Sequence, residues 1–212
     1  FQSPNTRWEF NLEKAAQLLD QSGWMRGGDG FRIKAGRRMK ILYQTSVNPV
    51  RQKTQAIAKK AFEQIGIEVE LKAVNASVYF SSDPGNPDTY AHFYADIQMY
   101  NTLAGSPDPQ AHLNRFLSGQ IAQKANNWSG RNVLRWSSAE YDRVWKEAES
   151  ELDPVKRAAL IITLNDLLIE DVVVIPVIWR NGVRAVSYKL HGMELTSWDS
   201  DFWDLAYWYR EA

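Results

Sequence analysis

The fold is decided by residues 39–73, which read MKILYQTSVNPVRQKTQAIAKKAFEQIGIEVELKA. The stretch begins with Met39 to Tyr43, a mostly apolar segment of strand length that we expect to be a core strand. Asn48-Pro49 then predicts a helix start, because an asparagine side chain caps free backbone N–H groups and proline fits the first helical turn. We expect this helix from Val50 to Ile65, and Gly66 marks its end.

A second strand follows the helix. Strict alternation over Ile67 to Ala73 places Glu68, Glu70 and Lys72 outward and Ile67, Val69, Leu71 and Ala73 inward. The helix residues expected on one apolar side are Ile57, Ala61, Phe62 and Ile65. Strand, helix and strand in this order predict a crossover that leaves the two strands parallel in one sheet.

Upstream of this stretch, the sequence predicts a helix and a small hairpin. Asn11 can cap a helix that ends before Gly23 and whose apolar stripe is Leu12, Ala15, Ala16 and Leu19. The glycine-rich turn 27–30 leads into a short strand, Phe31 to Lys34, which turns back into the central strand.

Downstream, helices and strands continue to alternate, so the fold class is α/β with a mixed sheet. The first predicted elements are a strand at Ala95 to Tyr100, a short helix at Gln110 to Leu117, and a helix from Ala139 with Tyr141, Val144, Trp145, Ala148 and Leu152 at helical spacing. Asp153-Pro154 then caps a long, largely buried helix that runs to about Ile169. A buried strand at Val172 to Trp179, a turn at Asn181-Gly182 and a returning strand at Val183 to Val186 follow it.

Composition excludes several functions. Lys plus Arg and Asp plus Glu each number 25, so the chain lacks the basic field that nonspecific nucleic-acid binding needs. The absence of cysteine excludes disulfides, thiolate zinc sites and a cysteine nucleophile. No apolar run is long enough to span a bilayer. Nine Trp, nine Tyr and eight Phe favour either a core with half-buried surface rings or a ligand cleft.

Several short runs of the chain form an ordered pattern. They are Gln21-Ser22-Gly23-Trp24, Asp29-Gly30-Phe31-Arg32, Gly36 to Ile41, Arg51 to Leu71, Ala95-Asp96-Ile97, Asp108-Pro109, Ser137 to Asp142, Ile175-Pro176 and Trp203-Asp204-Leu205. In this order and spacing they resemble family 5 bacterial solute-binding proteins, the group that contains dipeptide-, oligopeptide- and nickel-binding components of ABC importers. The resemblance covers nearly the whole chain.

The resemblance implies one lobe of a type II periplasmic-binding-protein fold, the two-lobed Venus flytrap. By this analogy residues 1–194 form the carboxy-terminal lobe, and residues 195–212 return along the hinge toward a first lobe that we expect outside this chain. The implied function is that of the substrate-binding component of an ABC importer, which captures a peptide or peptide-like solute as its lobes close. The implied partners are the solute, the first lobe and the ABC permease subunits. The implied location is periplasmic, or extracytoplasmic and lipid-anchored.

One loop decides how the resemblance applies to the ligand. In peptide-binding relatives, the loop after the Asp96-Ile97 strand carries a tryptophan and, three residues later, an aspartate that pairs with the free ammonium of the peptide. Thr102 and Gly105 occupy these positions here. The alternative ligand is therefore a non-peptide solute such as an opine, a sugar conjugate, an oligosaccharide or a metal chelate. We expect the loop to border the cleft, with contacts from Tyr100, Asn101, Thr102 and Gly105; an ordinary connecting loop is the other interpretation.

Two further ligand-binding candidates, Trp128 and Arg131, lie in a polar, irregular segment. An exposed ring beside a guanidinium suits stacking and anion binding, whereas a half-buried Trp128 that pins the loop is the structural alternative. Asp108 precedes a proline at a helix start, so we interpret it as a cap, with a ligand contact as the other option.

An enzyme would need a catalytic constellation, and none is evident in the sequence. His92, His112 and His191 stand in unrelated settings without metal-ligand spacing. No Ser–His–Asp pattern or glycine-rich phosphate loop stands between a strand and a helix. We therefore expect a non-catalytic binding lobe with no cofactor, no metal and no nucleic-acid partner. A periplasmic hydrolase built on a distant carboxylate pair is the remaining alternative.

Overall fold

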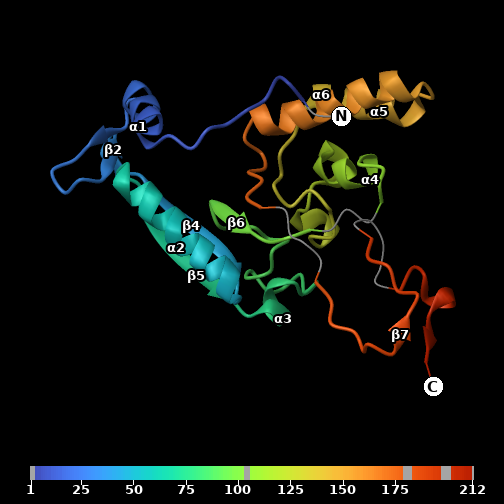
Figure 1. The fold of residues 1–212 in the computed structure, drawn as a ribbon. Helices are drawn as coiled ribbons and strands as arrows, with labels where there is room; N and C mark the ends of the chain where they lie inside the picture. Colours follow the sequence, from blue (N-terminus) through green and yellow to red (C-terminus); the bar gives the residue numbers. More distant parts are fainter. Residues whose placement is uncertain (1–2, 103–105, 179–182, 197–201, 212) are drawn as a thin grey trace. The chain divides into compact units, whose positions relative to one another are not determined.

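The computed structural model describes residues 3–102, 106–178, 183–196 and 202–211 (Figure 1). The chain divides into two compact units, which are described separately. The sheet unit comprises Arg7–Asn101 and Ile121–Arg135, and the helical unit comprises Phe1–Thr6, Thr102–Gln120 and Trp136–Ala212.

A parallel three-stranded sheet forms the centre of the sheet unit. Its strands are β4 (Lys40–Ser46), β5 (Glu68–Val74) and β6 (Ile97–Met99), in the order β5-β4-β6. Lys40 pairs with Glu68 and Ser46 with Val74, while Tyr43 to Thr45 pair with β6. Helix α2 (Pro49–Gln64) connects β4 to β5 and lies along both strands in Figure 1. The predicted parallel crossover is therefore confirmed.

Both predicted helix caps of this unit form. The Asn48 side chain accepts hydrogen bonds from the N–H groups of Val50 and Arg51, each at 3.1 Å, and starts α2. The Asn11 side chain accepts from the N–H of Lys14 at 2.8 Å and starts α1 (Leu12–Gln21). These bonds satisfy backbone donors that the first helical turn leaves without intrahelical partners.

The core of the sheet unit lies between the central sheet, α1 and α2. Its buried members are Tyr43, Ile65, Ile67 and Val69, and the partly buried apolar residues packed against them include Leu12, Ala15, Ala16, Leu19, Ala58, Phe62, Ile97 and Met99. All four residues of the predicted α1 stripe therefore face this core.

Three residues expected to face inward are exposed: Ile57, Leu71 and Ala73. Ile57 is 71% exposed, because the buried face of α2 runs instead through Gln55, whose Nε2 donates to the Tyr43 carbonyl at 2.7 Å. Leu71 is 38% exposed although it lies on β5, which is an edge strand of the described sheet. An edge strand has a neighbour on only one side, so alternation of residue type does not ensure burial there.

A small antiparallel sheet precedes the central one. It contains β1 (Met25–Arg26), β2 (Arg32–Lys34) and β3 (Arg37–Arg38), with β2 in the middle. The predicted hairpin is confirmed, and β1 is an addition that the sequence did not indicate. The sheet unit also contains the short helix α3 (Ala76–Tyr79) and an irregular segment with a 3-10 turn, η3 (Lys124–Asn126). Within that segment, Ile121 and Asn132 form a parallel bridge.

The helical unit is built on two long helices, α5 (Ala139–Ser150) and α6 (Pro154–Glu170). Ser138 caps α5, and Asp153 caps α6 by accepting from the N–H groups of Val155 and Lys156. The other elements are α4 (Gln110–Leu113), η1 (Asn114–Phe116), η2 (Ser118–Gln120), β7 (Leu190–His191), η4 (Leu205–Tyr207) and β8 (Tyr209–Arg210). The predicted helices are therefore present, with the short one split into α4 and η1.

Fewer residues of α5 and α6 are buried than the sequence predicted. On α5, Tyr141, Val144 and Ala148 are buried, but Leu152 lies beyond the helix end and is 94% exposed. On α6, burial is confined to a stripe around Leu164, so the expectation of a largely buried helix is wrong for this chain.

The two strands predicted after α6 are not formed. Residues 172–178 have no strand pairing, and Val172, Ile175, Val177 and Ile178 are exposed. Residues 183–186 are also irregular, while Trp179 and the Asn181-Gly182 turn lie outside the described residues. A strand needs a hydrogen-bonded neighbour, and Pro176 offers no N–H to one. Among the described residues, no helix is long and apolar enough to cross a membrane.

Candidate functional site

The carboxyl ends of β4, β5 and β6 meet at one edge of the central sheet, the position where open α/β sheets bind ligands. We call this the carboxyl edge, and its described residues include Ser46, Arg51, Phe80, Tyr100 and Asn101. Thr45 and Ser46 are fully buried, and the Thr45 hydroxyl donates to the Met99 carbonyl at 2.6 Å. This bond fixes the end of β6 against β4, so the residues that follow both strands are held together.

Arg51 supplies the charge at the carboxyl edge. It lies in the first turn of α2, where its guanidinium donates to Ser46 Oγ and to Asn101 Oδ1. The same guanidinium stands 5.8 Å from the centroid of the Phe80 ring. Within the described parts of the chain, Arg51 has no carboxylate partner. Because the amino end of α2 also carries positive partial charge, the edge is suited to an anion.

Aromatic rings form a row beside Arg51. The ring centroids of Tyr79 and Phe80 are 4.9 Å apart, those of Phe80 and Tyr90 6.0 Å, and those of Tyr90 and Tyr100 5.5 Å. Tyr79 is fully buried, and burial, together with the neighbouring Tyr100, raises the pKa of its hydroxyl, which therefore stays protonated. Phe80 is exposed, so the row presents ring surface to a ligand next to the guanidinium.

The predicted site residues do not all lie at the carboxyl edge. Tyr100 and Asn101 lie at the carboxyl edge, whereas Thr102 belongs to the helical unit, where its hydroxyl accepts from Arg115 Nη1 at 2.9 Å. Gly105 lies outside the described residues. Trp128 and Arg131 lie in the sheet unit. Trp128 is half-buried, with its ring centroid 4.3 Å from that of His92, and Arg131 is exposed.

Asp108 has the partners of a helix-start residue. One of its oxygens accepts from the N–H of Gln110 at 3.0 Å, and Arg157 Nη2 lies 2.8 Å from the other. The Gln110 N–H, and after it Arg157, hold the pKa of the Asp108 carboxyl below its usual value. The N-cap of α4 is Pro109, so Asp108 stands one residue before the predicted cap position and bonds the first helical N–H from there.

Sequence reasoning missed Arg51, Phe80 and Tyr90. The sequence did contain a signal for Arg51. Asn48 predicts a helix start just after a parallel strand, and Arg51 lies in the first turn of that helix. No local pattern marks Phe80 or Tyr90, which reach the site through ring contacts between α3 and the loop that follows it.

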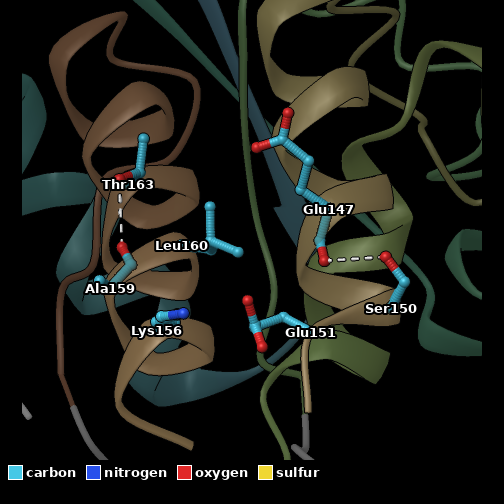
Figure 2. A pocket seen from close by; sticks show the side chains of 7 residues that line it. All are labelled: Glu147, Ser150, Glu151, Lys156, Ala159, Leu160 and Thr163. Carbon is cyan, nitrogen blue, oxygen red and sulfur yellow. Dashed lines mark hydrogen bonds between the residues drawn. The ribbon is translucent and has the colours of Figure 1, made fainter. Parts of the chain in front are cut away.

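A separate hollow lies in the helical unit between α5 and α6 (Figure 2). Its lining is Glu147, Ser150, Glu151, Lys156, Ala159, Leu160 and Thr163. The Ser150 and Thr163 hydroxyls donate to carbonyls of their own helices, those of Glu147 and Ala159. Because these hydroxyls are already bonded and the hollow is open to solvent, we do not assign it as the ligand site.

Chemically, the described residues of the carboxyl edge can hold an anionic group and pack an adjoining apolar group. Among the residues that the structure describes, no three His, Asp or Glu side chains come together as a metal site. Among the described histidines, one ring nitrogen is hydrogen-bonded to a hydroxyl: His92 Nδ1 lies 2.7 Å from Thr89 Oγ1, and both residues are buried.

The architecture defines a class of protein: one lobe of a type II periplasmic binding protein. The structure is similar to NikZ from Campylobacter jejuni in complex with Ni(L-His), with a TM-score of 0.74, 18% identity and coverage of 97% of this chain and 40% of that one. It is also similar to AppA from Bacillus subtilis in complex with a nonapeptide, with a TM-score of 0.69, 20% identity and coverage of 99% and 40%. The predicted fold class is confirmed.

The chain belongs to the bacterial extracellular solute-binding proteins of family 5, whose middle-region model matches residues 1–124. Among curated relatives it is 29% identical over 183 residues to the oligopeptide-binding protein OppA of Mycobacterium tuberculosis, and 24% identical over 184 residues to the dipeptide-binding protein DppE of Bacillus subtilis. These matches cover 85% and 86% of this chain but only 28% and 30% of the relatives. The resemblance read from the sequence is confirmed, and the matched relatives are named as binding proteins, not enzymes.

Proposed function

We propose that this chain is one lobe of the substrate-binding component of an ABC importer and captures a peptide or peptide-like solute as two lobes close. The observation that carries the proposal is Arg51, a guanidinium without a carboxylate partner in the described structure, set beside ring surface at the carboxyl edge. The relatives named for dipeptide and oligopeptide binding support the substrate class.

The chemistry of Arg51 selects one end of a peptide. A guanidinium presents a planar fork of N–H donors that matches a carboxylate, and Ser46 and Asn101 hold that fork in place. The carboxy-terminal carboxylate of a peptide is therefore the group expected at this edge. At the other end, Gly105 stands where peptide-binding relatives are expected to carry an ammonium-binding aspartate. A peptide-like solute with a blocked or missing amine fits this combination better than a simple free peptide.

The proposed division of the chain follows from the same family assignment. Residues 1–194 would form the lobe, and residues 195–212 would return toward a second lobe supplied by sequence beyond this chain. The exposure of Phe202, Trp203, Leu205 and Tyr207 supports this, because apolar side chains in such number favour burial against a partner surface. The partners would be the solute, the other lobe and the permease subunits, in a periplasmic or lipid-anchored protein without catalytic activity.

The test compares ligand ends in the full gene product. Calorimetry would measure binding of an N-acetylated tetrapeptide with a free carboxylate and of its carboxamide, to the wild type and to Arg51→Gln. We expect Arg51→Gln to weaken carboxylate binding by about 10- to 100-fold, the equivalent of roughly 1.5–3 kcal/mol for hydrogen bonds to a charged group, and to leave carboxamide binding unchanged. Lys53→Gln is the matched control, since Lys53 is exposed on the same helix.

Each contrary result has a distinct meaning. If the gene product binds no peptide, the proposed substrate class is wrong. If Arg51→Gln weakens both ligands equally while the fold is intact by circular dichroism, Arg51 does not recognise a carboxylate. The 212-residue chain by itself should bind weakly, because half of the contacts would come from the other lobe; submicromolar affinity of the chain alone would contradict capture by closure.

A further inference from the structure

Backbone strain is concentrated at one aromatic corner of the sheet unit. Phe93, Trp128 and Arg135 have φ angles of 40°, 59° and 58°, in the left-handed region that residues with a Cβ avoid. Asn127 joins them at 51°. Bulky residues persist in this region only where the surroundings over-determine it, and such residues cluster at ligand sites.

The contacts that impose this conformation also lock the corner. Arg135 donates through Nη1 to the His92 carbonyl at 2.9 Å and through Nη2 to the Phe93 carbonyl at 2.8 Å. His92 is buried, its Nδ1 lies 2.7 Å from Thr89 Oγ1, and its ring lies 4.3 Å from that of Trp128. The segment that carries Trp128 is therefore fastened to the segment that carries His92 and Tyr94.

Ring geometry leaves one face of the Trp128 indole clear of the other two rings. The His92 and Tyr94 centroids lie 4.3 and 5.8 Å from that of Trp128 and only 5.4 Å from each other. Rings on opposite faces of the indole would be separated by nearly the sum of the first two distances. His92 and Tyr94 therefore flank the same side, and Trp128 and Tyr94 meet almost at a right angle, 87°.

Residues of this corner and of the segment just after Trp128 carry unused hydrogen-bond donors in the described structure. Within the described structure, neither Trp128 Nε1 nor the Tyr94 hydroxyl has a hydrogen-bond partner, and the exposed guanidinium of Arg131 has none either. Tyr94 is 61% exposed. An apolar ring face bordered by free N–H and O–H groups is complementary to a pyranose, which has C–H faces and a hydroxyl rim; an aromatic ligand would use only the faces.

We infer that Trp128, Tyr94 and Arg131 form a subsite that stacks a sugar ring of the solute. The corner is continuous with the carboxyl edge, because His92 is two residues from Tyr90 and the Tyr90 ring contacts Tyr100. Resting on the proposed function, the inference specifies a solute that places a carboxylate at Arg51 and a pyranose at Trp128. A glycosylated amino acid or short glycopeptide has this chemistry.

Three probes test the subsite in the full gene product by calorimetry: an N-acetylated tetrapeptide, the same peptide with an N-acetylglucosaminyl serine, and the same peptide with phenylalanine at that position. We expect the sugar to improve affinity about tenfold, and Trp128→Phe and Tyr94→Ala to remove that gain, so that these variants bind the glycopeptide no more tightly than the plain peptide. Tyr188→Ala, at another exposed tyrosine, is the control. The glycopeptide should also change tryptophan fluorescence in Trp8→Phe but not in Trp128→Phe.

The outcomes separate this inference from the proposed function. Equal affinity of the plain peptide and the glycopeptide, or a gain that survives both substitutions, would overturn the subsite while the importer function stands. An equal gain with phenylalanine would overturn the sugar assignment. If no peptide binds, a neutral hexasaccharide is tested: binding that depends on Trp128 supports the subsite without the peptide function, and no binding overturns both.

Discussion

Replacement of Arg32 should cost the sheet unit more stability than replacement of any exposed cation of the same hairpin. The Arg32 side chain is 1% exposed, and its guanidinium donates to three carbonyls and one carboxylate. Nε bonds to the Ile65 carbonyl at 2.6 Å, Nη1 to the Trp24 carbonyl and to Asp20 Oδ1, each at 2.5 Å, and Nη2 to the Ala16 carbonyl at 3.1 Å. One side chain thus joins α1, the turn after it and the end of α2.

The magnitude follows from what each partner does when the guanidinium is removed. In Arg32→Met the apolar volume is largely kept, but the Ile65 carbonyl loses its charged donor in a buried position. Asp20 is 50% exposed, so water can take over its bond. Removing one member of a buried charged network costs roughly 3–5 kcal/mol, and we expect Arg32→Met to fall in that range. Arg32→Lys should lose about half as much, because an ammonium cannot reach partners in several directions as the fork does.

Thermal denaturation and amide hydrogen exchange together provide the assay. In a chain of this length, 1 kcal/mol lowers Tm by about 2–4 °C, so Arg32→Met should melt roughly 6–20 °C below the wild type. Exchange should accelerate in α1 and at the end of α2. Arg37→Met is the control, since Arg37 is exposed on the neighbouring strand and should change stability by no more than about 0.5 kcal/mol. If Arg32→Met also stays within about 1 kcal/mol of the wild type, the network does not hold the unit together.

Two further predictions concern backbone space and pH. Gly66 has a φ of +88°, and a Cβ there would stand 3.0 Å from both Arg32 Cγ and the Gly30 carbonyl oxygen, whereas Gly36 has a φ of +74° and open space. Denaturation should therefore show Gly66→Ala losing about 2–4 kcal/mol and Gly36→Ala about 1 kcal/mol, and equal losses would refute the steric argument. Burial, followed by the Arg115 charge, lowers the pKa of His112 from 6.5. The folded state thus favours neutral His112, so its contribution to stability is full above pH 6.5 and is lost as pH falls through the folded pKa. In thermal melts between pH 7 and 5, His112→Gln should therefore lose less stability than the wild type does. An equal loss of stability with falling pH in the two proteins would contradict this.

Local rules were sufficient for the framework of the sheet unit. Asn11, Asn48 and Gly66 each act through neighbouring residues in the sequence, and the helix limits that they predict are those of the structure within about two residues. The parallel pairing of β4 and β5 follows from element order alone, because a crossover helix places the second strand beside the first in the same direction.

Predictions that depended on a distant partner were less successful. Ile57 was assigned to the apolar face by residue type, yet Gln55 occupies the buried position because its amide reaches the Tyr43 carbonyl. Val172 to Trp179 has the composition of a buried strand, but composition does not specify a neighbour, and no strand of the described structure pairs with residues 172–178. Burial and strand pairing are properties of two segments, and a single segment cannot determine them.

The candidate site shows the same limit, since only Tyr100 and Asn101 of its residues were anticipated. Arg51 bears on which end of a solute the carboxyl edge would accept. At an effective dielectric of about 20, the Coulomb energy between an unneutralised guanidinium and a ligand charge roughly 4 Å away is about 4 kcal/mol, repulsive for an ammonium and attractive for a carboxylate, and desolvation reduces the net gain for the carboxylate. Under the proposed function, a solute would therefore enter with its carboxylate toward Arg51 and its uncharged end toward Trp128. Such a ligand carries no ammonium, so it needs no aspartate at position 105, where the sequence has glycine.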